Sequence, residues 1–492
     1  MTPCRVMAVA VALGLAATSV RAQGADPQPP SVSELARLVA EQGRMLEEQK
    51  REIEQLRKQL EETQQLALAA HNRLEEQAKA APAPTVNAAV EERLAKIEES
   101  VQRIPELPTL PSDVFAAGEF PGSMRVPGTD VAMKVGGLVR ATAVNTFGPL
   151  GTEDRFVTSS IPVAGSPEAG KEARFVLTPI PSRVNLDVRT PTGVGAMRAF
   201  VEGDFAGSSR AFRLRHAYGQ WKDLIVGQTW STFADPEAEP DGIDFEGLNA
   251  IALFRQPLVR WTKPVGAGFS LAAAIENPAP DITNARGVSQ VPDFVVRARW
   301  EPPEGQKGPL GLVKVRQGVH VNLALLFRQL RGEPLDQPNT TLSTSGFGVG
   351  LSGRLAAPWQ ADTGQITFSS YAGSGIGRYI TDLGTLGGQD AYYDPETNTI
   401  DALPVFAWYL GYERRWDAKL RSTFTYGSVL VTNIAAQPGN AFHMTNRWSL
   451  NLTWSPIPRV DLVSEYLFGN RINKDGQKGT SNQLQLGTNF RF

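Results

Sequence analysis

The chain has 492 residues, a formal net charge of −2, 46 glycines, 35 prolines and 22 phenylalanines. This charge balance excludes a general binder of nucleic acids or other polyanions, which would carry a clear excess of Lys and Arg. The mean hydropathy of −0.21, with only one long apolar run, excludes a membrane protein built from many apolar helices. A transmembrane β-barrel is not excluded, because only alternate residues of its strands face lipid.

Residues 1–22 have the pattern of a secretory signal peptide. Arg5 precedes an apolar run from Val6 to Ala17, and Val20-Arg21-Ala22 gives a small-x-small cleavage site. The alternative is a membrane anchor, but the run has only about 12 residues and a spanning helix needs about 20. The single cysteine, Cys4, lies in this segment, so we predict a mature chain without disulfides or thiol chemistry. With only four histidines, we also predict no metal site and no cofactor.

Residues 23–80 contain a predicted coiled coil that joins several copies of the chain. From Ser31 to Lys79 there is no proline, and the a positions of successive heptads are apolar, whereas several d positions are Gln. The heptads leave a trimer and a dimer open, and a solvated single helix is the alternative to both. The expected oligomerisation residues are Val39, Leu46, Ile53, Leu56 and Leu60.

Residues 81–130 are predicted to be a Pro-rich linker with a short second helix. The segment Ala81-Pro82-Ala83-Pro84 interrupts the heptads, and a helical apolar spacing resumes between Val90 and Ile104. Prolines at 105, 108 and 111 then end all helix.

From residue 131 to 492 the apolar residues follow a period of two, which is typical of strands. The pattern predicts an all-β transmembrane barrel of sixteen antiparallel strands, preceded by the α-helical periplasmic coiled coil. An even count puts both ends of the barrel on the periplasmic side. The predicted strands are centred on 131–147, 173–190, 195–206, 210–222, 223–233, 250–264, 266–277, 292–301, 314–331, 344–355, 363–374, 403–416, 419–431, 443–455, 459–469 and 481–492.

Short and long connections alternate between these strands, which supports the barrel topology independently. Short periplasmic turns are predicted at 191–193, 222–223, 416–418 and 455–458, whereas 301–313 is long for a turn. Long outward loops are predicted at 148–172, 278–291, 374–402 and 470–480. Tryptophans near strand ends are expected to form the aromatic girdles at the membrane interfaces. They are Trp230, Trp261, Trp300, Trp416 and Trp454.

Arginines alternate with apolar residues along many of the predicted strands. A guanidinium on the lipid face costs roughly 2–4 kcal/mol at the midplane, so we predict that these side chains line the pore. There they present forked donors that suit carboxylates. The alternative is a structural role, in which they pair with wall carboxylates such as Glu202, Asp204 and Glu465. The predicted pore-lining, anion-binding residues are Arg140, Arg183, Arg189, Arg198, Arg213, Arg215, Arg260, Arg297, Arg299 and Arg328. Arg354 continues the same inward series.

An acidic segment follows the fifth predicted strand, at the place from which general porins fold a constriction loop into the channel. Acidic groups facing a basic wall give a transverse field that filters small polar solutes. The predicted constriction residues are Asp235, Glu237, Glu239, Asp241, Asp244 and Glu246.

Five motifs resemble those of the DcaP-like outer-membrane porins. They are Phe212–Trp221 (FRLRHAYGQW), Val226–Phe233 (VGQTWSTF), Gly375–Ile380 (GIGRYI), Leu420–Thr423 (LRST) and Trp454–Asp461 (WSPIPRVD). The resemblance implies a homotrimer of sixteen-stranded barrels with a periplasmic coiled-coil extension. It also implies a channel for small organic anions such as dicarboxylates and aromatic acids. Arg213 and Arg215 match the basic pore residues of that family.

The sequence therefore predicts a passive porin of the bacterial outer membrane, in contact with outer-membrane lipid and small anionic solutes, and not an enzyme. One alternative is a structural tether, in which the coiled coil binds peptidoglycan or a periplasmic partner. Another is a barrel phospholipase or protease. Such an enzyme needs a nucleophile motif, and none of the four histidines lies in one.

Overall fold

The computed structural model describes residues 116–170, 173–302, 318–360 and 362–492. The chain divides into two compact units, 1–109 and 110–492, and the description below concerns the second. The predicted signal peptide, the coiled coil with its five core residues and most of the linker lie outside the described residues, so they stay predictions. No helix in the described part is both long and apolar enough to span a bilayer.

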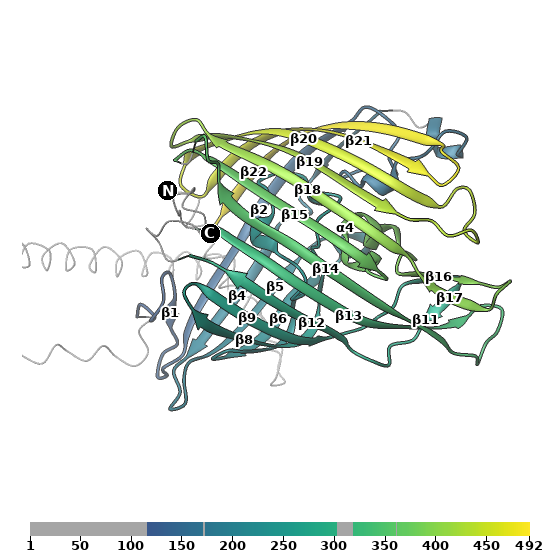
Figure 1. Cartoon of the computed structure of the whole chain (residues 1–492). Coiled ribbons are helices and arrows are strands. Elements are labelled where there is room, and N and C mark those ends of the chain that lie inside the picture. The colour runs from purple at the N-terminus through teal and green to yellow at the C-terminus, as the bar shows by residue number, and fades with distance from the viewer. Residues whose placement is uncertain (1–115, 171–172, 303–317, 361) are drawn as a thin grey trace, which may run out of the picture. The chain divides into compact units, whose positions relative to one another are not determined.

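The described residues form a closed antiparallel barrel (Figure 1). β2 (Ala132–Thr146) pairs on one edge with the last strand, β22 (Lys478–Arg491), which closes the wall. On its other edge β2 pairs with β3 (Arg174–Thr178) and β4 (Arg183–Thr190), which together make one interrupted strand. Counted in this way the wall has sixteen strands, so the predicted barrel is confirmed.

The other wall strands follow in chain order, and each pairs with its neighbours along the chain. Between β8 and β13 this order includes β9 and β12, and between β15 and β19 it includes β18. Their bounds are β5 (Met197–Asp204), β6 (Arg213–Trp221), β7 (Leu224–Trp230), β8 (Arg255–Gly266), β9 (Phe269–Glu276), β12 (Asp293–Trp300), β13 (His320–Pro334), β14 (Leu342–Ala356), β15 (Gly364–Ser374), β18 (Pro404–Arg415), β19 (Leu420–Val431), β20 (Phe442–Ile457) and β21 (Val460–Asn473).

The two faces of the strands have opposite chemistry. On β13, Leu323, Leu325 and Phe327 are exposed on the outer surface, whereas His320 and Arg328 are buried on the inner side. An outward apolar and inward polar alternation suits a wall between lipid and water. The period-two pattern in the sequence therefore corresponds to side chains that alternate between the outer and the inner face of the wall.

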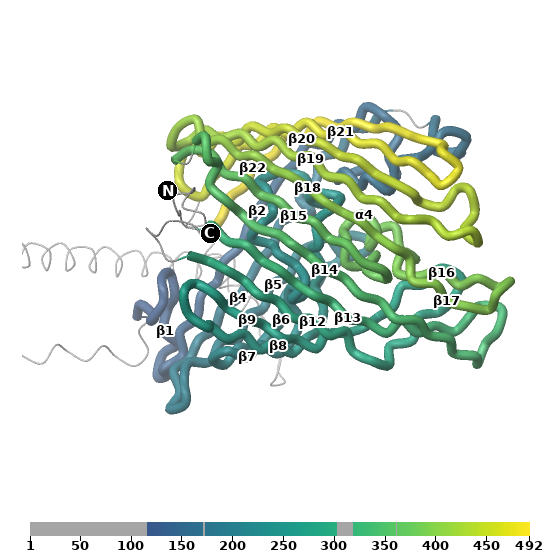
Figure 2. Tube along the Cα trace, in the orientation of Figure 1, coloured from purple at the N-terminus to yellow at the C-terminus, as the bar shows by residue number. Residues whose placement is uncertain are grey.

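The connections differ between the two ends of the barrel. One end has tight turns, such as Lys222–Asp223 between β6 and β7, and the C-terminus lies at this end (Figure 2). The other end has the long loops, including 375–403 with β16 (Ala391–Asp394) and β17 (Thr399–Ala402). One predicted long loop is wrong. Because β21 and β22 extend further than the apolar pattern suggested, segment 470–480 is a hairpin with only 474–477 between its strands.

Four further short elements decorate this framework. β10 (Ile282–Thr283) joins β16 and β17 in a separate small sheet, and β11 (Ala285–Gly287) extends the barrel wall next to β13. β1 (Met124–Arg125) pairs with the beginning of β2. α4 (Thr381–Leu386) lies in loop 375–403 and contributes buried residues to the interior.

The lumen is partly filled by residues 231–254, which we call the constriction loop. The predicted strand 250–264 begins only at Arg255, because its first five residues belong to this loop. Phe233 and Ile251 are fully buried in a cluster with Tyr371 and Ile376. The wall makes room for them with glycine. A Cβ on Gly348 of β14 would lie 2.8 Å from Ile376 Cγ2 and 3.2 Å from Phe233 Cζ.

This packing predicts that Gly348→Val destabilises the protein, whereas Gly193→Val, in the turn between β4 and β5, does not. The added side chain at 348 meets the packed loop, and overpacking a core typically costs about 1–3 kcal/mol. A Cβ at Gly193 meets nothing within 4 Å. Thermal unfolding of the two variants in detergent, followed by circular dichroism, measures the difference. Equal unfolding temperatures would contradict the packing described.

Candidate pore constriction

The constriction loop is anchored at its start by Asp235. Its carboxylate lies 3.0 Å from His320 Nε2 on β13 and accepts a hydrogen bond of 2.7 Å from Ser352 Oγ on β14. Burial raises the pKa of Asp235, but its interactions with His320 and Ser352 outweigh burial and lower the pKa to about 2. Asp235 therefore stays ionised across the working pH range and holds the loop to the wall.

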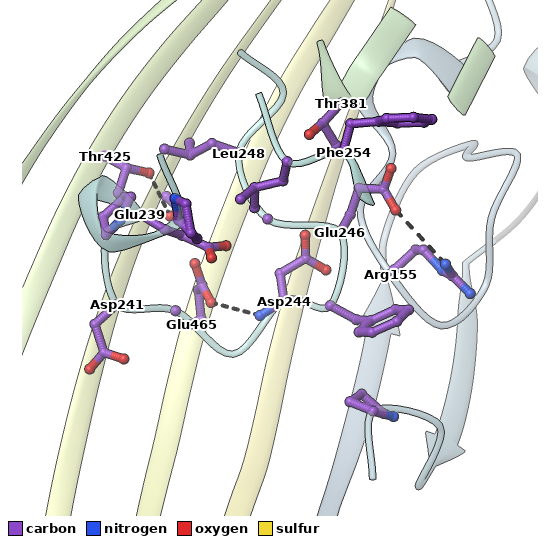
Figure 3. A pocket seen from close by; sticks show the side chains of 18 of the residues that line it. Arg155, Glu239, Asp241, Asp244, Glu246, Leu248, Phe254, Thr381, Thr425 and Glu465 are labelled. Carbon is purple, nitrogen blue, oxygen red and sulfur yellow. Dashed lines mark hydrogen bonds and ion pairs between the residues drawn. The ribbon is translucent and has the colours of Figure 1, made fainter. Parts of the chain in front are cut away.

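A second anchor fixes the middle of the loop to the opposite wall. Asp244 forms a buried ion pair with Arg447 of β20 at 2.8 Å and accepts a 2.8 Å hydrogen bond from Gln485 Nε2 of β22. Glu465 of β21 accepts hydrogen bonds from the backbone N–H groups of Ile243 and Asp244 (Figure 3). Since these strands lie across the barrel from β13, the loop spans the lumen.

Three more acidic residues of the loop are paired. Asp241 forms an ion pair of 2.6 Å with Arg421, and Glu237 pairs with Arg299. Glu246 accepts a hydrogen bond from Thr385 and lies 3.8 Å from Arg155. Glu239 differs, because its carboxylate has no hydrogen bond or ion pair with any residue that the structure describes.

A second loop packs against the constriction loop inside the barrel. The backbone N–H of Thr381 donates to the carbonyl of Ile251, and that of Asp382 donates to Asn249. Asp382 also accepts hydrogen bonds from the Ser159 backbone and the Thr445 side chain. Nothing in the sequence pattern indicated this inward loop, because its turns and single short helix carry no sustained apolar period.

These loops and the wall enclose a cavity of about 850 Å³. Eleven arginines and six acidic residues line it, so arginine is the predominant charged residue of the lining. Figure 3 shows several of its acidic side chains, among them Glu239, Asp244 and Glu465. The lining arginines are Arg140, Arg155, Arg183, Arg213, Arg215, Arg255, Arg354, Arg378, Arg415, Arg421 and Arg447.

Four of the ten arginines predicted for the pore line this cavity. Arg140 donates to Asn489 Oδ1 and to the carbonyl of Ile243 on the constriction loop. Arg183 lies 3.8 Å from Glu202. Arg213 and Arg215, the pair matched by the family motif, both form ion pairs of 2.8 Å with the buried Asp204. Arg215 also pairs with Glu202, so the structural alternative describes these two residues well.

The other six predicted arginines do not line this cavity. Arg189 and Arg198 share the carboxylate of Asp187, and Arg299 lies between Glu237 and Glu301. Arg328 is buried and pairs with Asp293 and Asp390. Arg260 donates to the carbonyl of Trp230, and Arg297 borders a separate small hollow in the wall. Strand alternation predicts which side of the wall a side chain faces, but not how far along the barrel axis it lies.

Several lining residues were not among the predicted pore residues. Arg354, which was expected to continue the inward arginine series, does line the cavity. The same alternation applies to Arg415, Arg421 and Arg447, which lie on strands, so the sequence pattern could have indicated them as well. Arg155 and Arg378 lie in loops, where no period gives a direction. Trp230, expected in an interface girdle, instead lines the cavity, with the Arg255 guanidinium 4.3 Å from its ring centroid.

The lining arginines fall into two groups. Eight have an acidic partner within 4 Å, and these ion pairs hold loops and strands together. Arg140, Arg255 and Arg354 have no ion pair with a described residue. Arg354 donates only to the backbone carbonyl of Glu239. These three guanidinium groups are therefore the lining arginines that no ion pair with a described residue holds.

The anchors predict that Arg447→Met loosens the constriction loop. Removing one partner of a buried ion pair costs about 3–5 kcal/mol, because Asp244 is left buried without its cation. We expect noisier single-channel current and faster protease cleavage within 231–254. Arg189→Met is the control, because Arg189 is half exposed and distant from the loop. Identical noise and cleavage rates in both variants would show that the Asp244 anchor does not hold the loop.

Comparisons with known proteins agree with this architecture. A family model described as DcaP outer membrane protein matches residues 125–492. The outer membrane channel DcaP of Acinetobacter baumannii is 21% identical with a TM-score of 0.64, over 77% of this chain and 100% of that one. An anion-selective porin from Comamonas acidovorans is 11% identical with a TM-score of 0.49, over 74% and 100%. No curated protein sequence matches the chain.

The family match covers about three quarters of the chain and nearly the whole barrel. The wall has outward apolar and inward polar faces, an inward loop and a charged cavity, as a porin requires. The chain therefore belongs to the DcaP outer membrane protein family and forms a channel of the outer membrane.

Proposed function

We propose that the channel passes small organic anions, such as dicarboxylates and aromatic acids, by passive diffusion. The observation that carries this proposal is the arginine-rich lining of the cavity, in which three of the eleven arginines have no ion pair with a described residue. Arg140, Arg255 and Arg354 lack an acidic partner among the described residues and supply the sites for a solute carboxylate. A guanidinium binds a carboxylate with two parallel hydrogen bonds and stays charged at every working pH.

Aromatic rings in the same cavity support the proposal that aromatic acids are among the solutes. Arg155 lies 4.8 Å from the ring centroid of Phe245, and Arg378 lies 4.4 Å from that of Phe254. With Trp230 under Arg255, the cavity offers flat apolar surfaces next to cations. An aromatic carboxylate is stabilised by the rings through ring contacts and by the cations through a charge-assisted hydrogen bond.

The proposal predicts that Arg255→Ala and Arg354→Ala lower anion selectivity. Each change removes a positive charge that no described acidic side chain neutralises. The measurement is the reversal potential of purified protein in a planar bilayer under a salt gradient, with and without an added dicarboxylate. Arg198→Ala is the control, because Arg198 pairs with Asp187 outside the cavity. A wild-type channel without anion preference would refute the proposal.

We further infer that the protein is a homotrimer whose barrel wall around β3 and β5 to β7 faces the partner copies. β5 to β7 have only seven to nine residues, against sixteen in β20. β3 pairs only with β2 among the described strands, and its Phe175 and Leu177 are 68% and 67% exposed. A second copy would cover these side chains, and the predicted heptads of 23–80, placed in the periplasm, support the same assembly.

The trimer inference predicts that Phe175→Lys with Leu177→Lys weakens assembly but not folding of the single barrel. Charges on an apolar interface oppose association because they must be desolvated. Chemical crosslinking and native mass measurement of the purified protein give the oligomeric state, and crosslinking of the isolated 31–104 segment tests the heptads separately. Val349→Lys, on the opposite outer wall, is the control. A monomeric wild-type protein would exclude the trimer.

A further inference from the structure

Glu239 differs from every other acidic residue of the constriction loop. Its five companions each help to fix the loop, through ion pairs or hydrogen bonds to the wall or to loops. The Glu239 carboxylate has no such partner among the described residues, although its side chain lines the cavity. A carboxylate that is not held by a hydrogen bond or an ion pair is available to act on the solute.

The surroundings of Glu239 are strongly cationic. Arg140 of β2, Arg183 of β4 and Arg215 of β6 all act electrostatically on its carboxylate from the far wall. On its own side the carboxylate rests against Gly247, where a Cβ would lie 2.9 Å from Glu239 Oε1. Gly247 has a φ of +78°, a conformation that suits glycine, so the turn leaves space for the carboxylate at this place.

We propose that Glu239 is a specificity-determining residue, whose carboxylate competes with the solute carboxylate for the cationic wall and thereby speeds release of bound anions. This inference rests on the proposed anion transport. Conduction requires binding that is favourable enough for entry and weak enough for exit. A cavity with eleven arginines favours entry, and a tethered negative charge on the opposite side favours exit. The effect is larger for a dianion, because the repulsion scales with the charge of the solute.

The ionisation of Glu239 responds to pH near neutrality. Burial raises its pKa to about 7, against the opposing influence of Arg140, Arg183 and Arg215, while the neighbouring Asp241 raises it further. Below pH 7 the group is mostly neutral and its competition is lost. Above pH 7 it is ionised and competes.

Two other elements contact this part of the loop. From β14, Arg354 donates to the Glu239 backbone carbonyl, and from β18, Tyr409 donates to the carbonyl of Ala238. A pH response that disappears on replacing Glu239 reports this carboxylate.

The test is single-channel recording of the full-length protein with succinate as the dianion and acetate as the monoanion. At pH 8, we expect Glu239→Gln to lengthen the residence time of succinate about tenfold and that of acetate less. Glu239→Asp keeps the charge and retains the wild-type residence times. Glu237→Gln is the matched control, because Glu237 lies on the same loop, pairs with Arg299 and does not line the cavity.

Changing the pH gives a second readout. Wild-type residence times for succinate should be longer at pH 6 than at pH 8, and Glu239→Gln should remove this difference. If the wild-type channel is anion-selective but Glu239→Gln behaves like Glu237→Gln, the role of Glu239 is refuted and the proposed function stands. If the wild-type channel shows no anion preference, the proposed function itself fails.

Discussion

The architecture depends on one constraint, which is that backbone N–H and C=O groups inside a membrane must all be paired within the protein. The pairing of β2 with β22 satisfies this constraint, because it removes the free edges of the sheet over most of the wall. Closure then divides the side chains into two sets. Apolar residues such as Leu323 and Phe327 face outward, and charged residues collect inside, where water and opposite charges are available. The concentration of arginine in the lumen is thus a consequence of closing the wall.

Inside the barrel, charge serves two separate purposes. Most arginines form ion pairs with loop or wall carboxylates, such as Arg447 with Asp244 and Arg328 with Asp293. These pairs hold the loops in place inside the barrel. A smaller number has no acidic partner in the described structure and leaves a net positive field in the cavity. The same residue type therefore builds the framework and supplies the filter. Only the identity of each neighbour distinguishes the two uses.

Sequence reasoning predicted the sixteen strands and the acidic loop after β7, because the period of two and the turn spacing are local properties. It was less accurate for the site. Arg328 and Arg140 have the same pattern in the sequence, yet one is buried between two aspartates and the other lines the cavity. The difference comes from loops that fold back into the lumen, such as α4 and its flanking residues. Their position is set by contacts far apart in the chain, such as that between Ser159 and Asp382, which no local pattern contains.

The anchoring of the constriction loop has a consequence for assembly. Ala238 accepts its hydrogen bond from a residue 171 positions later, and Asp244 is bonded by Gln485, which lies 241 positions further on. The loop therefore emerges from synthesis long before most of its partners exist, and such non-local contacts form late. Until β19 and β20 join the wall, Asp241 and Asp244 lack their arginine partners, Arg421 and Arg447. The middle of the constriction loop is thus fixed in place by the last third of the chain.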